Sequence, residues 1–199
     1  MSLKTRLAVS IVAVLLLADV GRWASAGEPT EAIRNAVNQG VEILKQAKLD
    51  NQKERAKVID QLRQIVYPLF DFGEMAMRSL GANWRRLNEQ QKQEFVSTFT
   101  ALLEKTYADQ IDVYDGQQVV YTGETVDGNY AQVDSRIIDK KGQTYSVAYK
   151  LHKVDERWRI YDVVAENISL VNNYRSQFNR VIARSSFEEL LKRMKEQAS

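Results

Sequence analysis

The residues of this chain that could do chemistry are one histidine and a few carboxylates. Serine hydrolysis needs a histidine base beside the serine and a carboxylate behind it, and His152 is the only histidine. Alternating apolar and polar residues place His152 on the polar face of a strand with Lys150 and Ser146, which predicts an exposed strand histidine. Because zinc takes histidine and cysteine ligands and the chain has no cysteine, we expect no metal site and no cofactor.

The carboxylates leave one enzymatic alternative open. A buried carboxylate can act as a tuned general acid or base, and Asp162 lies among apolar neighbours on a predicted strand. The alternative is an enzyme that uses Asp162 or Asp134 as base and a tyrosine as acid. Because buried polar groups are normally satisfied by backbone donors, the structural interpretation is a hydrogen-bonded strand aspartate at Asp162 and a helix cap at Asp71.

The first 26 residues have the three parts of a secretory signal peptide. Lys4 and Arg6 precede an apolar run over 7–18, and a small-residue cleavage box ends at Ala26. The run is shorter than the about 20 apolar residues that span a bilayer. We therefore predict cleavage after Ala26, which leaves residues 27–199 as a single domain outside the cytoplasm.

Charge and cysteine content exclude further classes of protein. The chain has 28 basic and 26 acidic residues, of which the signal holds three and one, so 25 of each remain and the net charge is zero. Nucleic-acid binders usually have a basic excess, so we expect no nucleic-acid partner. The absence of cysteine excludes thiol–disulfide chemistry.

Helical periodicity occurs at both ends of residues 27–199. Apolar residues recur at helix spacing from residue 29 onward, and Pro68 is predicted to end the second helix near Tyr67. A long helix is predicted to run as far as about Tyr114. The residues predicted to cap helix N-termini are Asn51, Asp71, Asn88, Ser169 and Ser186.

Between the helices the period changes to two, which predicts four strands joined by hairpin turns. The order of the elements predicts an α+β fold: N-terminal helices, a four-stranded antiparallel meander, then C-terminal helices, with helices on one face of a curved sheet. Periodicity leaves open whether these layers pack closely or enclose an apolar pocket for a lipophilic ligand. The predicted strands are Gln118–Val126, Asn129–Asp139, Gln143–Val154 and Arg157–Asn167.

Short motifs spread in order over nearly the whole of residues 27–199 carry a resemblance to a known family. They are Phe70-Asp71-Phe72, Arg78-Ser79-Leu80-Gly81 with Trp84, Glu94-Phe95, Leu102-Leu103-Glu104 with Tyr107, Trp158 with Tyr161-Asp162-Val163, and Ser169-Leu170 with Asn173-Tyr174-Arg175-Ser176-Gln177-Phe178. Through them the chain resembles the MlaC or toluene-tolerance family, the periplasmic lipid carriers of the Mla lipid transport system. It departs from the family pattern at Asn167, often a glycine, and at Ala148, commonly an aspartate.

The resemblance implies a periplasmic phospholipid carrier that does no chemistry. It implies a deep apolar pocket between sheet and helices that holds the acyl tails, two in the expected ligand, with the headgroup at the mouth. The implied partners are an inner-membrane ABC transporter with its lipid-binding subunit and an outer-membrane lipoprotein complex. A related branch accompanies hopanoid biosynthesis, so a hopanoid stays open as an alternative ligand.

The predicted binding residues are apolar side chains of these motifs and of the facing strands. Guanidinium groups are forked donors to phosphate, so three arginines near Trp84 are the headgroup candidates: Arg78, Arg85 and Arg86. The predicted pocket wall consists of Phe70, Phe72, Met75, Leu80, Trp84, Phe95, Phe99, Leu102, Leu103, Tyr107, Val147, Tyr149, Leu151, Ile160, Val163, Leu170, Tyr174 and Phe178.

Overall fold

The computed structural model describes residues 27–47, 51–108 and 116–199. The predicted signal peptide and the predicted extension of the long helix to Tyr114 lie outside these residues. Among the described helices, each is too short or too polar to cross a bilayer.

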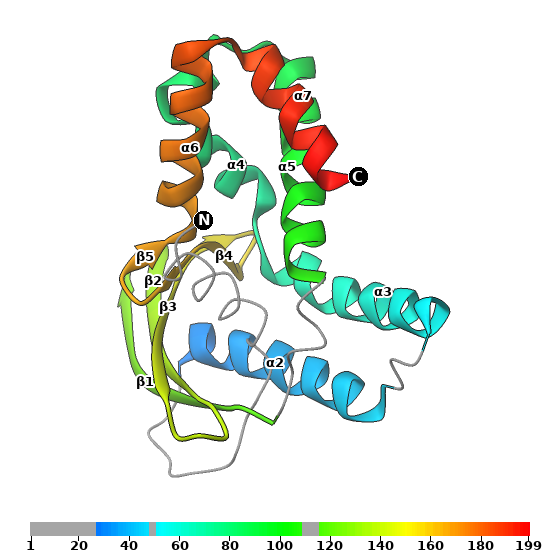
Figure 1. Cartoon of the computed structure of the whole chain (residues 1–199). Helices are drawn as coiled ribbons and strands as arrows, with labels where there is room; N and C mark the ends of the chain where they lie inside the picture. Colours follow the sequence, from blue (N-terminus) through cyan, green and yellow to red (C-terminus); the bar gives the residue numbers. More distant parts are fainter. Residues whose placement is uncertain (1–26, 48–50, 109–115) are drawn as a thin grey trace.

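An antiparallel sheet forms one layer of the fold, as predicted, and its strands follow one another in sequence order (Figure 1). The sheet has five strands rather than four. Glu166 and Asn167 both have left-handed backbone, with φ of 47° and 64°, and such a turn sends the chain straight back along the strand that it leaves. The strands are β1 (Gln118–Asp127), β2 (Tyr130–Ile138), β3 (Thr144–Val154), β4 (Arg157–Ala165) and the two-residue β5 (Ile168–Ser169).

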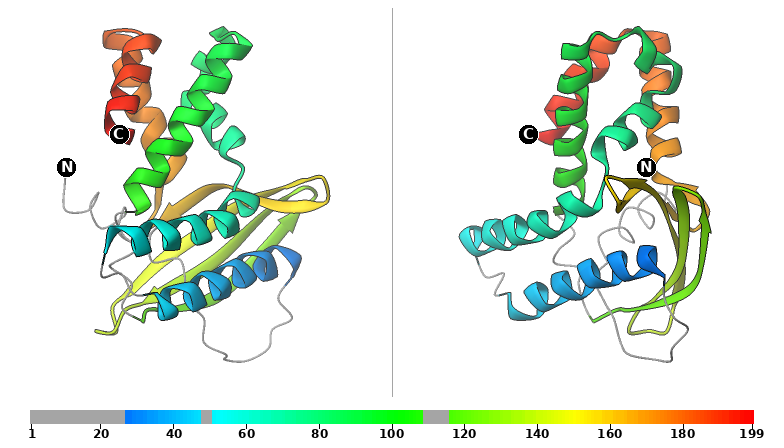
Figure 2. Two further views of the ribbon diagram at one scale, coloured as in Figure 1. Left: turned by 90° about the vertical axis from the view of Figure 1, so that its right-hand side faces the viewer. Right: turned by 180° about the vertical axis from the view of Figure 1, so that it is seen from behind.

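Two N-terminal helices, α2 (Glu28–Gln46) and α3 (Gln52–Leu69), lie side by side next to the curved sheet (Figures 1 and 2). α2 buries Ile33, Val37 and Val41 in a core shared with the inner sheet face. α3 extends past the predicted end at Tyr67, because the Phe70 N–H still donates to the Val66 carbonyl at 3.0 Å. A proline in the last turn removes only its own N–H from the helix.

The remaining helices form a bundle that extends beyond one end of the sheet (Figure 2). Stacked and edge-on rings of Phe95, Phe99 and Phe178 lie at its centre, with centroids 5.7–5.9 Å apart. The α+β prediction is therefore confirmed. The bundle consists of α4 (Phe72–Leu80), η1 (Gly81–Arg86), α5 (Glu89–Ala108), α6 (Leu170–Arg184) and α7 (Phe187–Ala198).

The predicted helix caps are confirmed. Each cap side chain accepts a hydrogen bond from the backbone N–H three residues later, which satisfies one of the free donors of the first turn. The pairs are Asn51 with Glu54, Asp71 with Glu74, Asn88 with Gln91, Ser169 with Asn172, and Ser186 with Glu189.

The prediction of an exposed His152 is wrong. Only 15% of its side chain is exposed, and its Nε2 lies 3.0 Å from Asp71 Oδ2. The chain leaves α3 by pairing with β4, where the Asp71 N–H donates to the Ile160 carbonyl at 2.9 Å. This pairing brings the start of α4 over the corner of the sheet that carries His152, a contact that strand alternation cannot reveal.

Candidate functional site

A largely apolar cavity of about 200 Å³ lies where the sheet, the α2–α3 pair and the bundle meet. It separates the core between α2 and the sheet from the core of the bundle, and Phe70 packs against both. Its lining residues are Ile33, Ala36, Val37 and Leu44 of α2; Ile59, Leu62, Arg63, Ile65, Val66, Tyr67 and Leu69 of α3; Phe70; Phe72 and Met75 of α4; Leu103, Glu104 and Tyr107 of α5; Tyr149 and Ile160 of the sheet; and Leu170 of α6.

The structure divides the predicted wall residues into two groups. Those that line the cavity are Phe70, Phe72, Met75, Leu103, Tyr107, Tyr149, Ile160 and Leu170. The others pack in the two cores away from it: Val147, Leu151 and Val163 between sheet and α2, and Leu80, Trp84, Phe95, Phe99, Leu102, Tyr174 and Phe178 in the bundle. The role of any of them in lipid binding stays a prediction.

Sequence reasoning missed the wall that α2 and α3 supply. Ile33, Val37 and Leu44 of α2 line this part of the cavity together with Ile59 and Leu62 of α3. Leu44, Ile59 and Leu62 also pack together in a small cluster between the two helices. The available signal was the apolar stripe on each helix at spacings of three and four residues. That stripe shows which face of a helix is buried, but not whether a solid core or an empty space lies against it.

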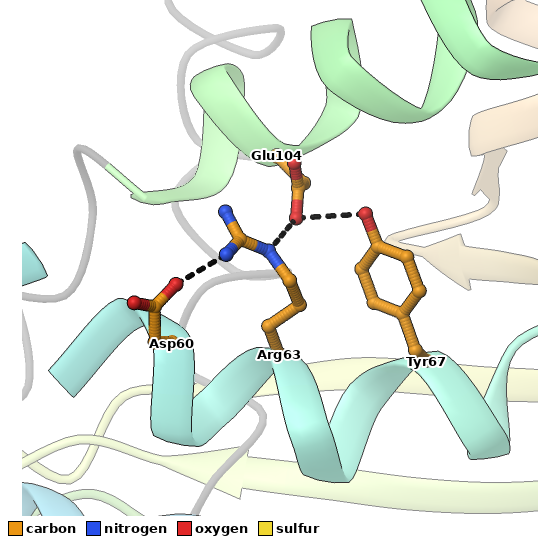
Figure 3. A network of polar contacts seen from close by, with 4 residues as sticks. All are labelled: Asp60, Arg63, Tyr67 and Glu104. Atoms are coloured by element: carbon orange, nitrogen blue, oxygen red, sulfur yellow. Dashed lines mark hydrogen bonds and ion pairs between the residues drawn. The ribbon is translucent and has the colours of Figure 1, made fainter. Parts of the chain in front are cut away.

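One edge of the cavity is polar. Arg63 of α3 donates through Nε to Glu104 Oε1 of α5 at 2.5 Å, and the Tyr67 hydroxyl donates to the same oxygen at 2.9 Å (Figure 3). Arg63 also donates through Nη1 to Asp60, one turn earlier on α3. The hydrogen bond to Glu104, more than any other contact, raises the pKa of Arg63. We call these four residues the polar cluster.

The three predicted headgroup arginines lie away from this edge. Arg78 pairs with Glu74 at 2.7 Å, and its guanidinium lies 4.2 Å from the centre of the Tyr161 ring. Arg85 and Arg86 are exposed in η1. None of the three lines the cavity, so headgroup binding by them stays a prediction.

The candidate catalytic aspartates also lie outside the cavity lining. Asp162 is 5% exposed, and it accepts the Ser169 hydroxyl at 2.7 Å and the Val171 N–H at 3.1 Å. The structural interpretation of Asp162 is therefore confirmed, because both carboxylate oxygens are used to hold the start of α6 to β4. Asp134 accepts a hydrogen bond from Gln132 at 2.9 Å on the sheet surface. Within the described ranges, no cluster of three or more His, Asp or Glu residues could hold a metal ion.

Tyr149, in the cavity wall, is expected to make the free energy of unfolding sensitive to alkaline pH. It is 1% exposed, and burial raises its pKa. The contribution of such a tyrosine to the free energy of unfolding is complete below the pKa of the unfolded state, about 10. It is lost as the pH rises above that value, by about 1.4 kcal/mol per pH unit. We expect Tyr149→Phe to reduce the slope of unfolding free energy between pH 9 and 11 in urea titrations. Tyr130→Phe, at an exposed tyrosine, should leave the slope unchanged, and equal slopes in all three proteins would contradict the prediction.

Comparison with known proteins identifies the family. The family model described as MlaC protein matches residues 34–196. The chain belongs to the MlaC family. Among MlaC relatives, it is 24% identical over 159 residues to the intermembrane phospholipid transport system binding protein MlaC of Haemophilus influenzae, covering 75% of this chain and 74% of that protein. It is 23% identical over 174 residues to the toluene tolerance protein ttg2D of Pseudomonas putida, covering 86% and 81%.

The fold of this MlaC-family chain is also that of a solved structure. The phospholipid-binding protein from Ralstonia solanacearum, solved in complex with a phospholipid, aligns with a TM-score of 0.71 at 24% identity. The alignment covers 86% of this chain and 97% of the Ralstonia chain.

Proposed function

We propose that this MlaC-family protein is a periplasmic carrier that holds a phospholipid by its acyl tails and moves it between the inner and outer membranes. The observation that carries the proposal is the apolar cavity, whose charged side chains lie together at one edge. Such a site suits an amphipathic ligand. The names of the Haemophilus and Ralstonia relatives, which refer to phospholipid transport and phospholipid binding, support the same ligand class.

A carrier of this kind needs apolar shielding and no catalytic group. A tail of about 16 carbons gains about 12 kcal/mol from burial, at about 0.8 kcal/mol per methylene, so its escape through water is very slow. The cavity of about 200 Å³ is smaller than the about 300–1,000 Å³ of typical ligand pockets. We infer that loading widens it.

The remaining parts of the proposal concern processing and partners. Residues 1–26 act as a cleaved signal peptide, and residues 27–199 form a single lipid-binding domain. The membrane partners are an inner-membrane ABC transporter with a lipid-binding subunit and an outer-membrane lipoprotein complex. N-terminal sequencing of the exported protein should begin at Gly27, and retention of Met1 on a membrane-bound form would contradict the export proposal.

Native mass spectrometry of the purified protein tests the carrier proposal. We expect an additional mass of phospholipid size, and extraction should return that lipid chemically intact. Protein without lipid mass, which also fails to take up lipid from vesicles after delipidation, would instead indicate an adaptor between envelope proteins. Recovery of a cleaved lipid would indicate an enzyme, and a hopanoid mass would change the ligand class while leaving a carrier.

A further inference from the structure

The polar cluster differs in charge from the rest of the cavity lining, and it is more exposed than the deepest wall residues. Arg63 and Glu104 have 42% and 28% of their side chains exposed, whereas wall residues such as Ile33, Met75 and Tyr149 are 1% exposed. Among the described lining residues, Arg63 and Glu104 are the only charged ones. The cluster therefore lies at a solvent-exposed edge of the cavity, a position that suits the headgroup of a lipid with buried tails.

Within the described part of the chain, two charged atoms of the cluster are left for a ligand. Glu104 Oε1 accepts both hydrogen bonds, from Arg63 Nε and from the Tyr67 hydroxyl, and Arg63 uses Nη1 for Asp60. Within the described residues, Arg63 Nη2 and Glu104 Oε2 make no further hydrogen bond. A guanidinium nitrogen is a donor for phosphate, and a carboxylate oxygen is an acceptor for an ammonium group.

The charge balance of the cluster selects between headgroups. Asp60 and Glu104 supply two negative charges against the single positive charge of Arg63, and both carboxylates contact its guanidinium (Figure 3). A headgroup that carries only a phosphate charge meets Arg63 beside an excess of carboxylate. A zwitterionic headgroup can place its phosphate on Arg63 and its ammonium on Glu104, so both of its charges have a partner.

We propose that the polar cluster is a headgroup site for zwitterionic, amine-bearing phospholipids, with Arg63 binding the phosphate and Glu104 binding the amine. This inference rests on the proposed carrier function and adds to it a preference among phospholipids. Because the groups are partly exposed, the preference is modest: an exposed ion pair changes an equilibrium constant by a factor of about 1.5 to 5. Salt should reduce it further by screening.

The test is competitive loading of the delipidated protein. The probe is vesicles of equimolar phosphatidylethanolamine and phosphatidylglycerol with identical acyl chains, and native mass spectrometry counts each bound lipid. The wild-type protein should carry about three- to fivefold more phosphatidylethanolamine than phosphatidylglycerol at low salt. Glu104→Gln removes the amine partner and one negative charge, so the ratio should fall to near one.

Arg63→Gln should shift the ratio in the opposite direction. It leaves two carboxylates without a guanidinium, so total loading falls and phosphatidylglycerol falls most. A purely structural link between α3 and α5 would change both lipids equally in either variant. Arg193→Gln is the matched control, because it breaks an exposed 2.6 Å arginine–glutamate pair on α7, and it should leave the ratio unchanged.

The outcomes separate this inference from the carrier proposal. Two results would overturn the headgroup site and leave the carrier proposal intact. The first is normal total loading of the wild-type protein with equal amounts of phosphatidylethanolamine and phosphatidylglycerol. The second is a ratio of these two lipids that changes in the same direction in Arg63→Gln and Glu104→Gln. Absence of both lipids from the wild-type protein would overturn the carrier proposal itself.

Discussion

Ala36→Trp and Leu103→Trp are each expected to reduce the affinity for phospholipid at least tenfold while the protein stays folded. Ala36 lies on α2 and Leu103 on α5, and both line the cavity. An indole that occupies this space excludes part of an acyl tail. Displacing only two methylenes costs about 1.6 kcal/mol of burial at about 0.8 kcal/mol each, which is more than a tenfold loss of affinity. The measurement is the bound-lipid fraction by native mass spectrometry after equilibration with vesicles.

Two tryptophan controls distinguish cavity filling from a general effect of the large side chain. Asn35→Trp and Lys105→Trp place the indole at exposed positions next to the test sites on the same helices, and both proteins should load normally.

Val163→Trp is a different case, because Val163 is packed in the core between sheet and α2, and overpacking there costs about 1–3 kcal/mol of stability. If folded Ala36→Trp and Leu103→Trp proteins carried a normal lipid load, the tails would bind elsewhere.

Asp162→Ala is expected to lower the free energy of unfolding by about 3 kcal/mol, because it leaves the buried Val171 N–H and the Ser169 hydroxyl without their charged acceptor. For a domain of this size that is a fall in melting temperature of about 6–12 °C. Asp162 joins β4 to the first turn of α6, so its loss weakens the connection between the sheet and the bundle. Thermal and urea unfolding of the delipidated protein measure the effect without a contribution from ligand.

Asp134→Ala is the matched control for this prediction. Asp134 lies on the surface of β2, where its carboxylate accepts a hydrogen bond from Gln132, and substitutions at such positions usually change stability by less than about 0.5 kcal/mol. Asp162→Asn should be intermediate, because its amide oxygen can replace one of the two accepting oxygens. Equal stability of Asp162→Ala and the wild-type protein would show that other contacts hold the start of α6.

Features that depend on neighbours in the chain could be predicted from the sequence. The caps from Asn51 to Ser186 were found because a capping side chain reaches a backbone N–H only three residues away. The inward face of β3, with Val147, Tyr149 and Leu151, follows from the two-residue period of a strand. The ordered set of motifs was sufficient to indicate the MlaC family before any contact was known.

Tertiary structure decided which of these faces meet. Arg63 and Glu104 are 41 residues apart, and Asp71 and His152 are 81 apart, so no local pattern relates either pair. The same stripe of apolar residues on α2 or α3 would line a solid core or a cavity, depending on how the two layers of the fold diverge. Periodicity reports only that a face avoids water, whereas an empty space and the charged groups at its edge result from the packing of separate elements.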